Sequence, residues 1–135
     1  MIQDVTLETR TRPRRKPGEF ELSLDPRVTD PASFKVSFLI LLDGDLVMSP
    51  EHLGVAYMAS VLRHVGFTAE IREVEHGDEH HAAAIAHLRE YQPDLVCFTL
   101  MSLNVTSCVS LCRQLREALP DTPIACGGPA GTFAG

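Results

Sequence analysis

Two stretches of this sequence join an apolar run to small and hydroxyl side chains, the residue types that hold a ligand through hydrogen bonds and bare backbone. They read PDLVCFTLMSLN and TPIACGGPAGTFAG. Gly127 and Gly128 remove two side chains, so a broad, flat ligand could lie against the backbone there. Thr99, Ser102 and Thr132 could donate hydrogen bonds to a polar tail of that ligand. An ordinary tight turn at the two glycines explains the second stretch equally well.

These stretches belong to a pattern in which strands alternate with helices. Continuous apolar runs such as KVSFLILL predict strands that are buried on both faces. The run FTAEIREV alternates instead, with Phe67, Ala69 and Ile71 on one side, and predicts an exposed edge strand. The expected strands are residues 35–42, 67–74, 95–100 and 123–126.

Three stretches between the strands carry apolar residues at helical spacing. Ser49 before Pro50, Asp78 and Asn104 are the expected N-terminal caps. The helices should end near Gly66, before Pro93 and at Pro120. Their apolar positions are Leu53, Tyr57, Val61 and Val65 in the first, Ile85 and Leu88 in the second, and Val105, Cys108, Cys112, Leu115 and Leu119 in the third.

Strands and helices in this order predict a doubly wound α/β domain with a parallel sheet, because strand-helix-strand crossovers are right-handed. The edge-like second strand favours the flavodoxin-like (Rossmann-like) order 2-1-3-4. Ligands of such sheets bind beyond the carboxyl ends of the strands, which here are followed by residues 43–50, 99–104 and 127–132. We expect one domain over residues 34–135, after an extended or partly disordered segment over residues 1–33.

The charge distribution limits the classes of partner. The net charge is −6, and all of the excess acid lies beyond residue 34. An acidic domain is a poor binder of nucleic acid, and the basic cluster from Arg10 to Lys16 is expected to be a solvated tail. No apolar run approaches 18 residues and no secretory signal opens the chain, so we expect no membrane partner and a cytoplasmic location.

Several sites of chemistry are missing or weak in the sequence. Neither GxGxxG nor GxxxxGK[ST] occurs, and no catalytic triad or carboxylate pair is evident, so catalytic residues are not predicted. The four cysteines form no CxxC pair, and we expect them to be reduced, packed thiols. The histidines at positions 76, 80, 81 and 87 are expected to be solvated and to lie on the rim opposite the ligand site.

Three motifs at these separations resemble the N-terminal cobalamin (B12)-binding domain of B12-dependent radical SAM enzymes. They are SPEHLGVAYMASVLRHVGF, QPDLVCFTLMSLN and TPIACGGPAGTFAG, and the resemblance covers residues 35–135. It implies a corrinoid ligand, with methylcobalamin as the methyl donor of a methyltransferase. The residues that it assigns to cofactor binding are Leu53, Gly54, Thr99, Met101, Ser102, Gly127, Gly128 and Thr132.

Two departures from related proteins limit what this chain can hold. Methionine-synthase-like B12 modules place Asp-x-His-x-x-Gly after the first strand, whereas Asp45 stands at the His position here and Met48 at the Gly position. The resemblance therefore implies cobalamin without a lower-ligand histidine from this motif. Cys108-x-x-x-Cys112 has Leu115 where a third cluster ligand would fall, so no iron-sulfur cluster is expected in this chain.

The resemblance leaves the catalytic barrel outside this chain. We therefore expect either a radical SAM partner chain or self-association through an open fourth strand, since the fifth strand of the fold is missing. Two other functions remain open from the sequence. One is a degenerate flavodoxin-like interaction module that has lost the ligand, and the other is an α/β domain that binds a different small molecule or nucleotide.

Overall fold

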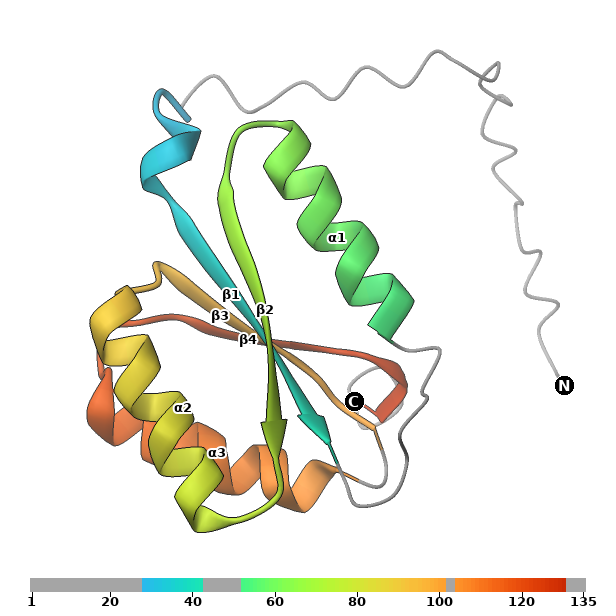
Figure 1. Ribbon diagram of the computed structural model, residues 1–135, viewed down its shortest axis with the longest axis vertical. Coiled ribbons are helices and arrows are strands. Elements are labelled where there is room, and N and C mark those ends of the chain that lie inside the picture. Colours follow the sequence, from blue (N-terminus) through green and yellow to red (C-terminus); the bar gives the residue numbers. More distant parts are fainter. Residues whose placement is uncertain (1–27, 43–51, 102–103, 131–135) are drawn as a thin grey trace, which may run out of the picture.

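The computed structural model describes residues 28–42, 52–101 and 104–130. Over these residues the chain forms four strands, three α-helices and one 3-10 turn (Figure 1). The strands are β1 (Lys35–Leu42), β2 (Thr68–Glu75), β3 (Leu95–Thr99) and β4 (Ile124–Gly127), and the helices are α1 (His52–His64), α2 (Asp78–Tyr91) and α3 (Val105–Ala118). The 3-10 turn, η1 (Pro31–Ser33), comes directly before β1.

All strand pairs are parallel, and the order in the sheet is β2-β1-β3-β4. This confirms the flavodoxin-like α/β fold predicted from the sequence. The carboxyl ends of the strands consequently meet at one edge of the sheet. Among the described residues, β4 pairs with β3 alone and leaves its other side open.

Strand β1 separates two hydrophobic cores, because successive side chains of a strand point to opposite faces. Leu39 and Leu41 enter one core, while Val36, Phe38 and Ile40 enter the other. All of the strand except its two terminal residues is buried. The apolar run at residues 35–42 therefore has the two-sided cover that its composition predicts.

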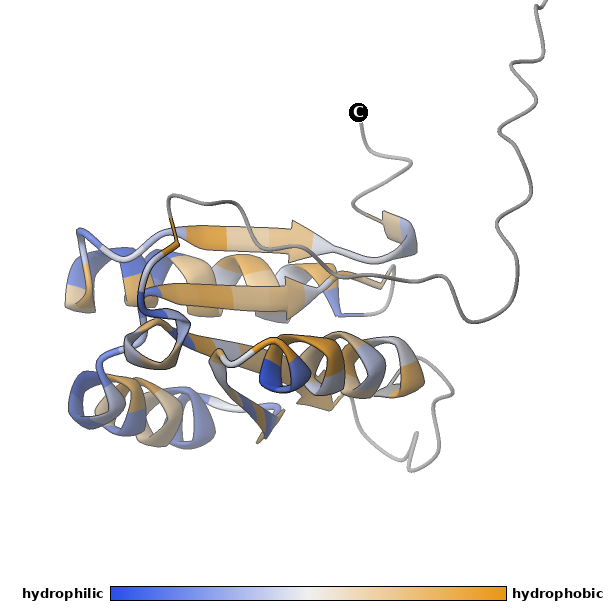
Figure 2. Ribbon diagram, turned by 90° about the horizontal axis from the view of Figure 1, so that it is seen from above, coloured by the Kyte–Doolittle hydropathy of each residue, from blue (hydrophilic) through white to orange (hydrophobic). Residues whose placement is uncertain are grey.

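The two cores are covered by different helices. Helix α1 lies on one face of the sheet and contributes Val55 and Ala59 to its core, whereas α2 and α3 lie together on the other face (Figure 1). Figure 2 shows the hydrophobic residues concentrated in the strands and α2 coloured largely as hydrophilic. One helix against two leaves the face of the sheet on the α1 side with less cover.

One polar group is fully enclosed beside β1 and is satisfied by a hydrogen-bonded chain. Ser37 is 0% exposed, and its hydroxyl donates to Glu70 Oε1 at 2.7 Å. Both carboxylate oxygens of Glu70 lie 3.0 Å from His87 Nε2, and the His87 ring stacks on Tyr91 with centroids 5.6 Å apart. A buried hydroxyl costs little when it is paired in this way.

Local details differ from the sequence predictions. Ile71 is 37% exposed, although Ala69 on the same side of β2 is buried, because only Ala69 packs into the core beneath α1. Asp78 was expected to cap α2, but it is the first residue of the helix, and Gly77 occupies the cap position without a side-chain hydrogen bond. The expected cap at Ser49 and Pro50 lies outside the described residues.

The core on the α2 and α3 side should dominate stability. We expect Leu88→Ala to lower the free energy of unfolding by about 2–5 kcal/mol, because Leu88 is 0% exposed and its loss leaves a cavity. Leu53→Ala is the matched control: Leu53 is also helical but 73% exposed, and its loss should change stability by less than about 0.5 kcal/mol. Urea unfolding measures both, and equal losses would contradict this assignment of the core.

Candidate cofactor site

A pocket opens where β1, β3 and β4 approach the carboxyl edge of the sheet, on the side of α1. We call it the rim pocket, and its volume is about 220 Å³. It joins three residues proposed from the sequence, Thr99, Gly127 and Gly128, to Val55 and Met58 of α1. The remaining lining residues are Phe38, Leu39, Cys97, Phe98, Ala125 and Cys126. Most of the pocket wall is therefore apolar.

The ends of β3 and β4 are tied together at this pocket by backbone hydrogen bonds. The Leu100 N–H donates to the Gly127 carbonyl at 2.7 Å, and the Ala130 N–H donates to the Leu100 carbonyl at 3.1 Å. The chain turns between these bonds at Gly128, whose φ is +93°. A Cβ at Gly128 would lie 2.7 Å from the Leu100 carbonyl oxygen, so only glycine fits there.

Gly127 differs from its neighbour, since a Cβ there would meet no atom of the described residues within 4 Å. No conformational need explains this glycine, and the space beside it opens at the rim pocket. Gly127 therefore keeps that surface flat, and Gly128 makes the turn that presents it. A glycine pair that an ordinary turn could account for has two separate roles.

Asn104 fixes the loop that follows β3 and is a positioning residue that the sequence prediction did not include among the site residues. It is 5% exposed, its side-chain oxygen accepts from the Met101 N–H at 2.8 Å, and its side-chain nitrogen donates to the Thr99 carbonyl at 3.3 Å. The expected N-terminal cap of α3 thus turns back toward β3, and its side chain makes no cap hydrogen bond. The sequence offers one hint of this role, because Asn side chains often bond to nearby backbone groups in turns.

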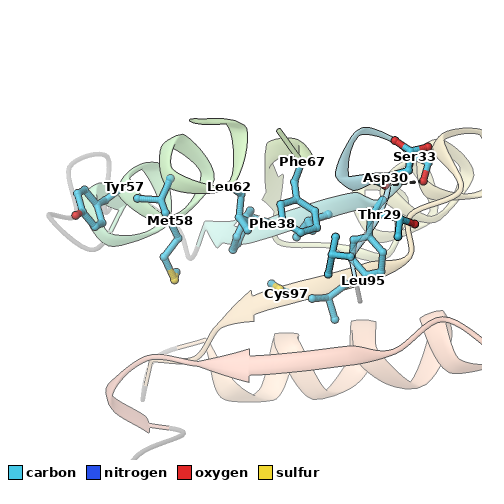
Figure 3. A pocket seen from close by; sticks show the side chains of 14 residues that line it. Thr29, Asp30, Ser33, Phe38, Tyr57, Met58, Leu62, Phe67, Leu95 and Cys97 are labelled. Atoms are coloured by element: carbon cyan, nitrogen blue, oxygen red, sulfur yellow. Dashed lines mark hydrogen bonds between the residues drawn. The ribbon is translucent and has the colours of Figure 1, made fainter. Parts of the chain in front are cut away.

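A larger apolar groove adjoins the rim pocket on the α1 side of the sheet. Its volume is about 860 Å³, and it shares Phe38, Met58 and Cys97 with the rim pocket. Figure 3 shows Tyr57, Met58 and Leu62 along one wall and Leu95 and Cys97 along the other. Tyr57 is 71% exposed, so the groove has a large aromatic side chain at its mouth. The two cavities therefore lie next to each other along α1 and β3.

A comparison with protein families matches residues 44–135 to the B12 binding domain. This match spans more than half of the chain and includes all three segments that follow β1, β3 and β4. The chain belongs to the B12-binding domain family. Its flavodoxin-like sheet and the glycine-floored pocket at the carboxyl edge agree with that membership.

The chain is also similar to a curated protein, the hopanoid C-3 methylase of Methylococcus capsulatus (strain ATCC 33009 / NCIMB 11132 / Bath). The two are 33% identical over 84 residues, which is 62% of this chain and 16% of the methylase. This B12-binding domain therefore matches only a small part of that longer protein.

Three of the other residues proposed from the sequence for the B12-binding domain lie in the described part of the chain, close in sequence to residues of the rim pocket. Leu53 and Gly54 lie in the first turn of α1, one turn from Met58, and Met101 follows β3. Within the described part of the chain, these three do not line the pocket. Ser102 and Thr132 lie outside the described residues, as do Asp45 and Met48 of the loop after β1.

The histidine prediction was wrong in location for His76, His80 and His81 and wrong in environment for His81, whereas His76 is exposed as expected. His76 directly follows β2, and His80 and His81 lie in the first turn of α2, so all three are at the carboxyl rim. His81 is 3% exposed, and its Nε2 lies 3.2 Å from the Ser107 hydroxyl in α3. That hydroxyl is also 3.2 Å from His76 Nδ1. The start of α2 packs against α3, which is why His81 is buried instead of solvated.

The cysteine prediction also needs correction at one position. Cys108 is fully buried and Cys97 and Cys112 are partly buried, as expected of packed thiols, but Cys126 is exposed because β4 is at the open edge. Burial raises the pKa of Cys108 to about 12 and that of Cys112 to about 11, with nearby thiols adding to both shifts.

No described helix is long and apolar enough to span a bilayer.

The two glycines predict a sharp difference in tolerance. Gly128→Ala should lower the free energy of unfolding by about 1–3 kcal/mol, because it combines a positive φ with a clash against Leu100. Gly127→Ala should leave stability within about 0.5 kcal/mol of the parent, since its Cβ meets open space. Chemical denaturation of the two variants tests this, and a costly Gly127→Ala would contradict the separation of roles.

The buried His81 predicts a loss of stability in acid. Burial lowers the pKa of His81, with Asp78 opposing and the His76 and His80 charges adding to that shift. As the pH falls below about 6.5, the unfolded chain takes up a proton that the folded chain still excludes, so the free energy of unfolding decreases until the folded pKa is passed.

Urea unfolding at pH 7.5 and pH 5.5 measures this effect. His81→Gln should remove part of the difference between the two pH values, whereas His64→Gln, at an exposed position in the last turn of α1, should preserve it. An unchanged difference in His81→Gln would show that this imidazole is not the group responsible.

Proposed function

We propose that this B12-binding domain holds methylcobalamin at the carboxyl edge of its sheet and serves a radical SAM methyltransferase whose catalytic barrel lies outside this chain. The observation that carries the proposal is the bare backbone at Gly127, where a Cβ would meet nothing within 4 Å beside the rim pocket. A flat macrocycle requires this kind of surface, and no packing contact among the described residues does.

The remaining geometry suits a cofactor with a broad face and a long tail. The corrin would rest over Gly127 and Gly128, with Thr99 and the loop clasped by Asn104 beside it. The tail would enter the rim pocket and continue into the apolar groove between α1 and β3, which offers about 860 Å³. Leu53, Gly54, Met101, Ser102 and Thr132 would complete the border of the site.

The donor set of the chain supports cobalamin without a protein lower ligand from the loop after β1. Asp45 stands where related modules carry the imidazole, and a carboxylate does not replace it. Two histidines do lie at the carboxyl rim, but each already has a partner: His76 Nδ1 and His81 Nε2 both contact the Ser107 hydroxyl. Neither is therefore proposed as the lower ligand. Bound methylcobalamin would supply a cobalt-held methyl group, and this chain's residues would bind and orient it.

The radical SAM assignment rests on the likeness to the hopanoid C-3 methylase and on the resemblance of the motifs. Nothing in the described residues offers an alternative catalytic centre, and Cys108 and Leu115 of the incomplete cluster spacing are core residues of α3, 0% and 1% exposed. A fully buried thiol in the core and an apolar side chain at the third position do not supply the ligands of a cluster. The cluster and the acceptor substrate would therefore belong to a partner domain or chain.

The test is retention of cobalamin by the purified chain. Titration with hydroxocobalamin and with methylcobalamin, followed by desalting and a visible spectrum, should leave about one corrinoid per chain. Gly127→Leu should reduce the retained cobalamin at least tenfold, because the side chain fills the surface proposed for the corrin without disturbing the fold. Gly128→Leu would not serve, since it clashes with Leu100 in the protein itself.

The matched control is Ala86→Leu, which adds the same side chain at an exposed position of α2 on the opposite face of the sheet. Its cobalamin retention should equal that of the parent. A folded parent that desalts colourless would overturn the proposal and favour an interaction module that has lost the ligand. Equal retention by Gly127→Leu would place the corrin elsewhere.

A further inference from the structure

A second pocket lies on the opposite face of the sheet, between α3 and β4, and it is lined by three of the four cysteines. Its volume is about 310 Å³, and Cys108, Cys112 and Cys126 all contribute to its wall. The pairing of β4 with β3 explains the direction of the Cys126 side chain. Cys126 is paired in register with Phe98, whose side chain belongs to the core beneath α2 and α3, so Cys126 faces α3.

The three thiols differ in their access to solvent. Cys108 is 0% exposed, Cys112 is partly buried against the core, and Cys126 is exposed at the open edge. Cys112 and Cys126 are close enough that the charge and hydrogen bonding of Cys126 raise the pKa of Cys112, after the larger effect of burial. The exposed Cys126 thiol thus lies beside the partly buried Cys112 thiol.

The surroundings of this pair favour reaction at Cys126. Cys126 is the exposed thiol of this pocket, so a dissolved oxidant reaches it more readily than it reaches Cys112 or Cys108. An exposed thiol with a second thiol next to it is the arrangement in which a sulfenic acid is captured as a disulfide. Cys97 cannot take the second role, because it packs into the α1 core on the other face of the sheet.

We propose that Cys112 and Cys126 form an oxidant-sensitive pair that hydrogen peroxide converts into an intrachain disulfide between α3 and β4. In the first step the Cys126 sulfur attacks peroxide, the O–O bond breaks, and Cys126 sulfenic acid and one water result. In the second step the Cys112 sulfur attacks the sulfenic sulfur, the S–O bond breaks, and the released hydroxide leaves as water with the Cys112 proton. Two thiols are oxidised and one peroxide is reduced to two waters.

The disulfide would link α3 to the edge strand β4, one residue before its end at Gly127. This inference goes beyond cobalamin binding and does not depend on it. Its readout is the covalent state of the chain.

The experiment treats the reduced, desalted full chain with equimolar hydrogen peroxide, blocks free thiols with N-ethylmaleimide, and measures the mass of the intact chain and of its tryptic peptides. We expect two fewer blocked thiols per chain and a link between the peptide that ends at Arg113 and the C-terminal peptide, reversed by dithiothreitol. Because Cys97, Cys108 and Cys112 share one tryptic peptide, variants identify the partner.

Cys112→Ser and Cys126→Ser should each reduce intrachain disulfide formation at least tenfold, and Cys97→Ser, the matched control, should form it at the parental rate. Cys126→Ser changes an exposed residue, so a failure of Cys112→Ser to fold would not remove the test. A link that persists in Cys112→Ser, a disulfide found only between chains, or sulfinic acid at Cys126 with Cys112 still free would each overturn the proposal.

Discussion

Strand β1 needs hydrogen-bond partners along both backbone edges and apolar cover on both faces. The rest of the domain supplies all four. The backbone of β1 pairs with β2 on one side and β3 on the other, and its side chains need apolar cover on both faces. The buried Ser37 hydroxyl also needs a hydrogen-bond partner, and Glu70 of β2 accepts its hydrogen bond. Burying a strand so completely requires neighbours on either side and helices on both faces, which dictates the doubly wound arrangement.

The rim pocket lies where the doubly wound arrangement leaves the carboxyl ends of the strands uncovered. Parallel strands end together, so loops from distant parts of the sequence meet at one edge. At the ends of β3 and β4, Leu100 bonds to both sides of the glycine turn, and the Asn104 side chain bonds to Met101. These bonds hold the two strand ends side by side, and the sparse cover on the α1 face leaves an apolar hollow beside them.

The sequence predicted the strands within about one residue at each end, because long apolar runs leave little ambiguity about burial. It was weaker where packing between elements decides the outcome. Periodicity does not reveal that His81 is buried beside α3, that Cys126 is exposed at an open edge, or that the Asn104 side chain bonds back to the residues after β3 from the cap position of its helix. The two glycines of the site were identified as a pair, but only the contact with Leu100 distinguishes their roles.

That distinction bears on how such a domain would change if its cofactor were no longer needed. Gly128 is required by the chain's own turn, so selection for folding alone would retain it in every descendant. Under the proposed function, Gly127 is kept for the ligand alone and would accumulate side chains once no ligand had to lie against it. On that proposal, Gly127 records whether a lineage still uses the surface, and Gly128 records only that the lineage still folds.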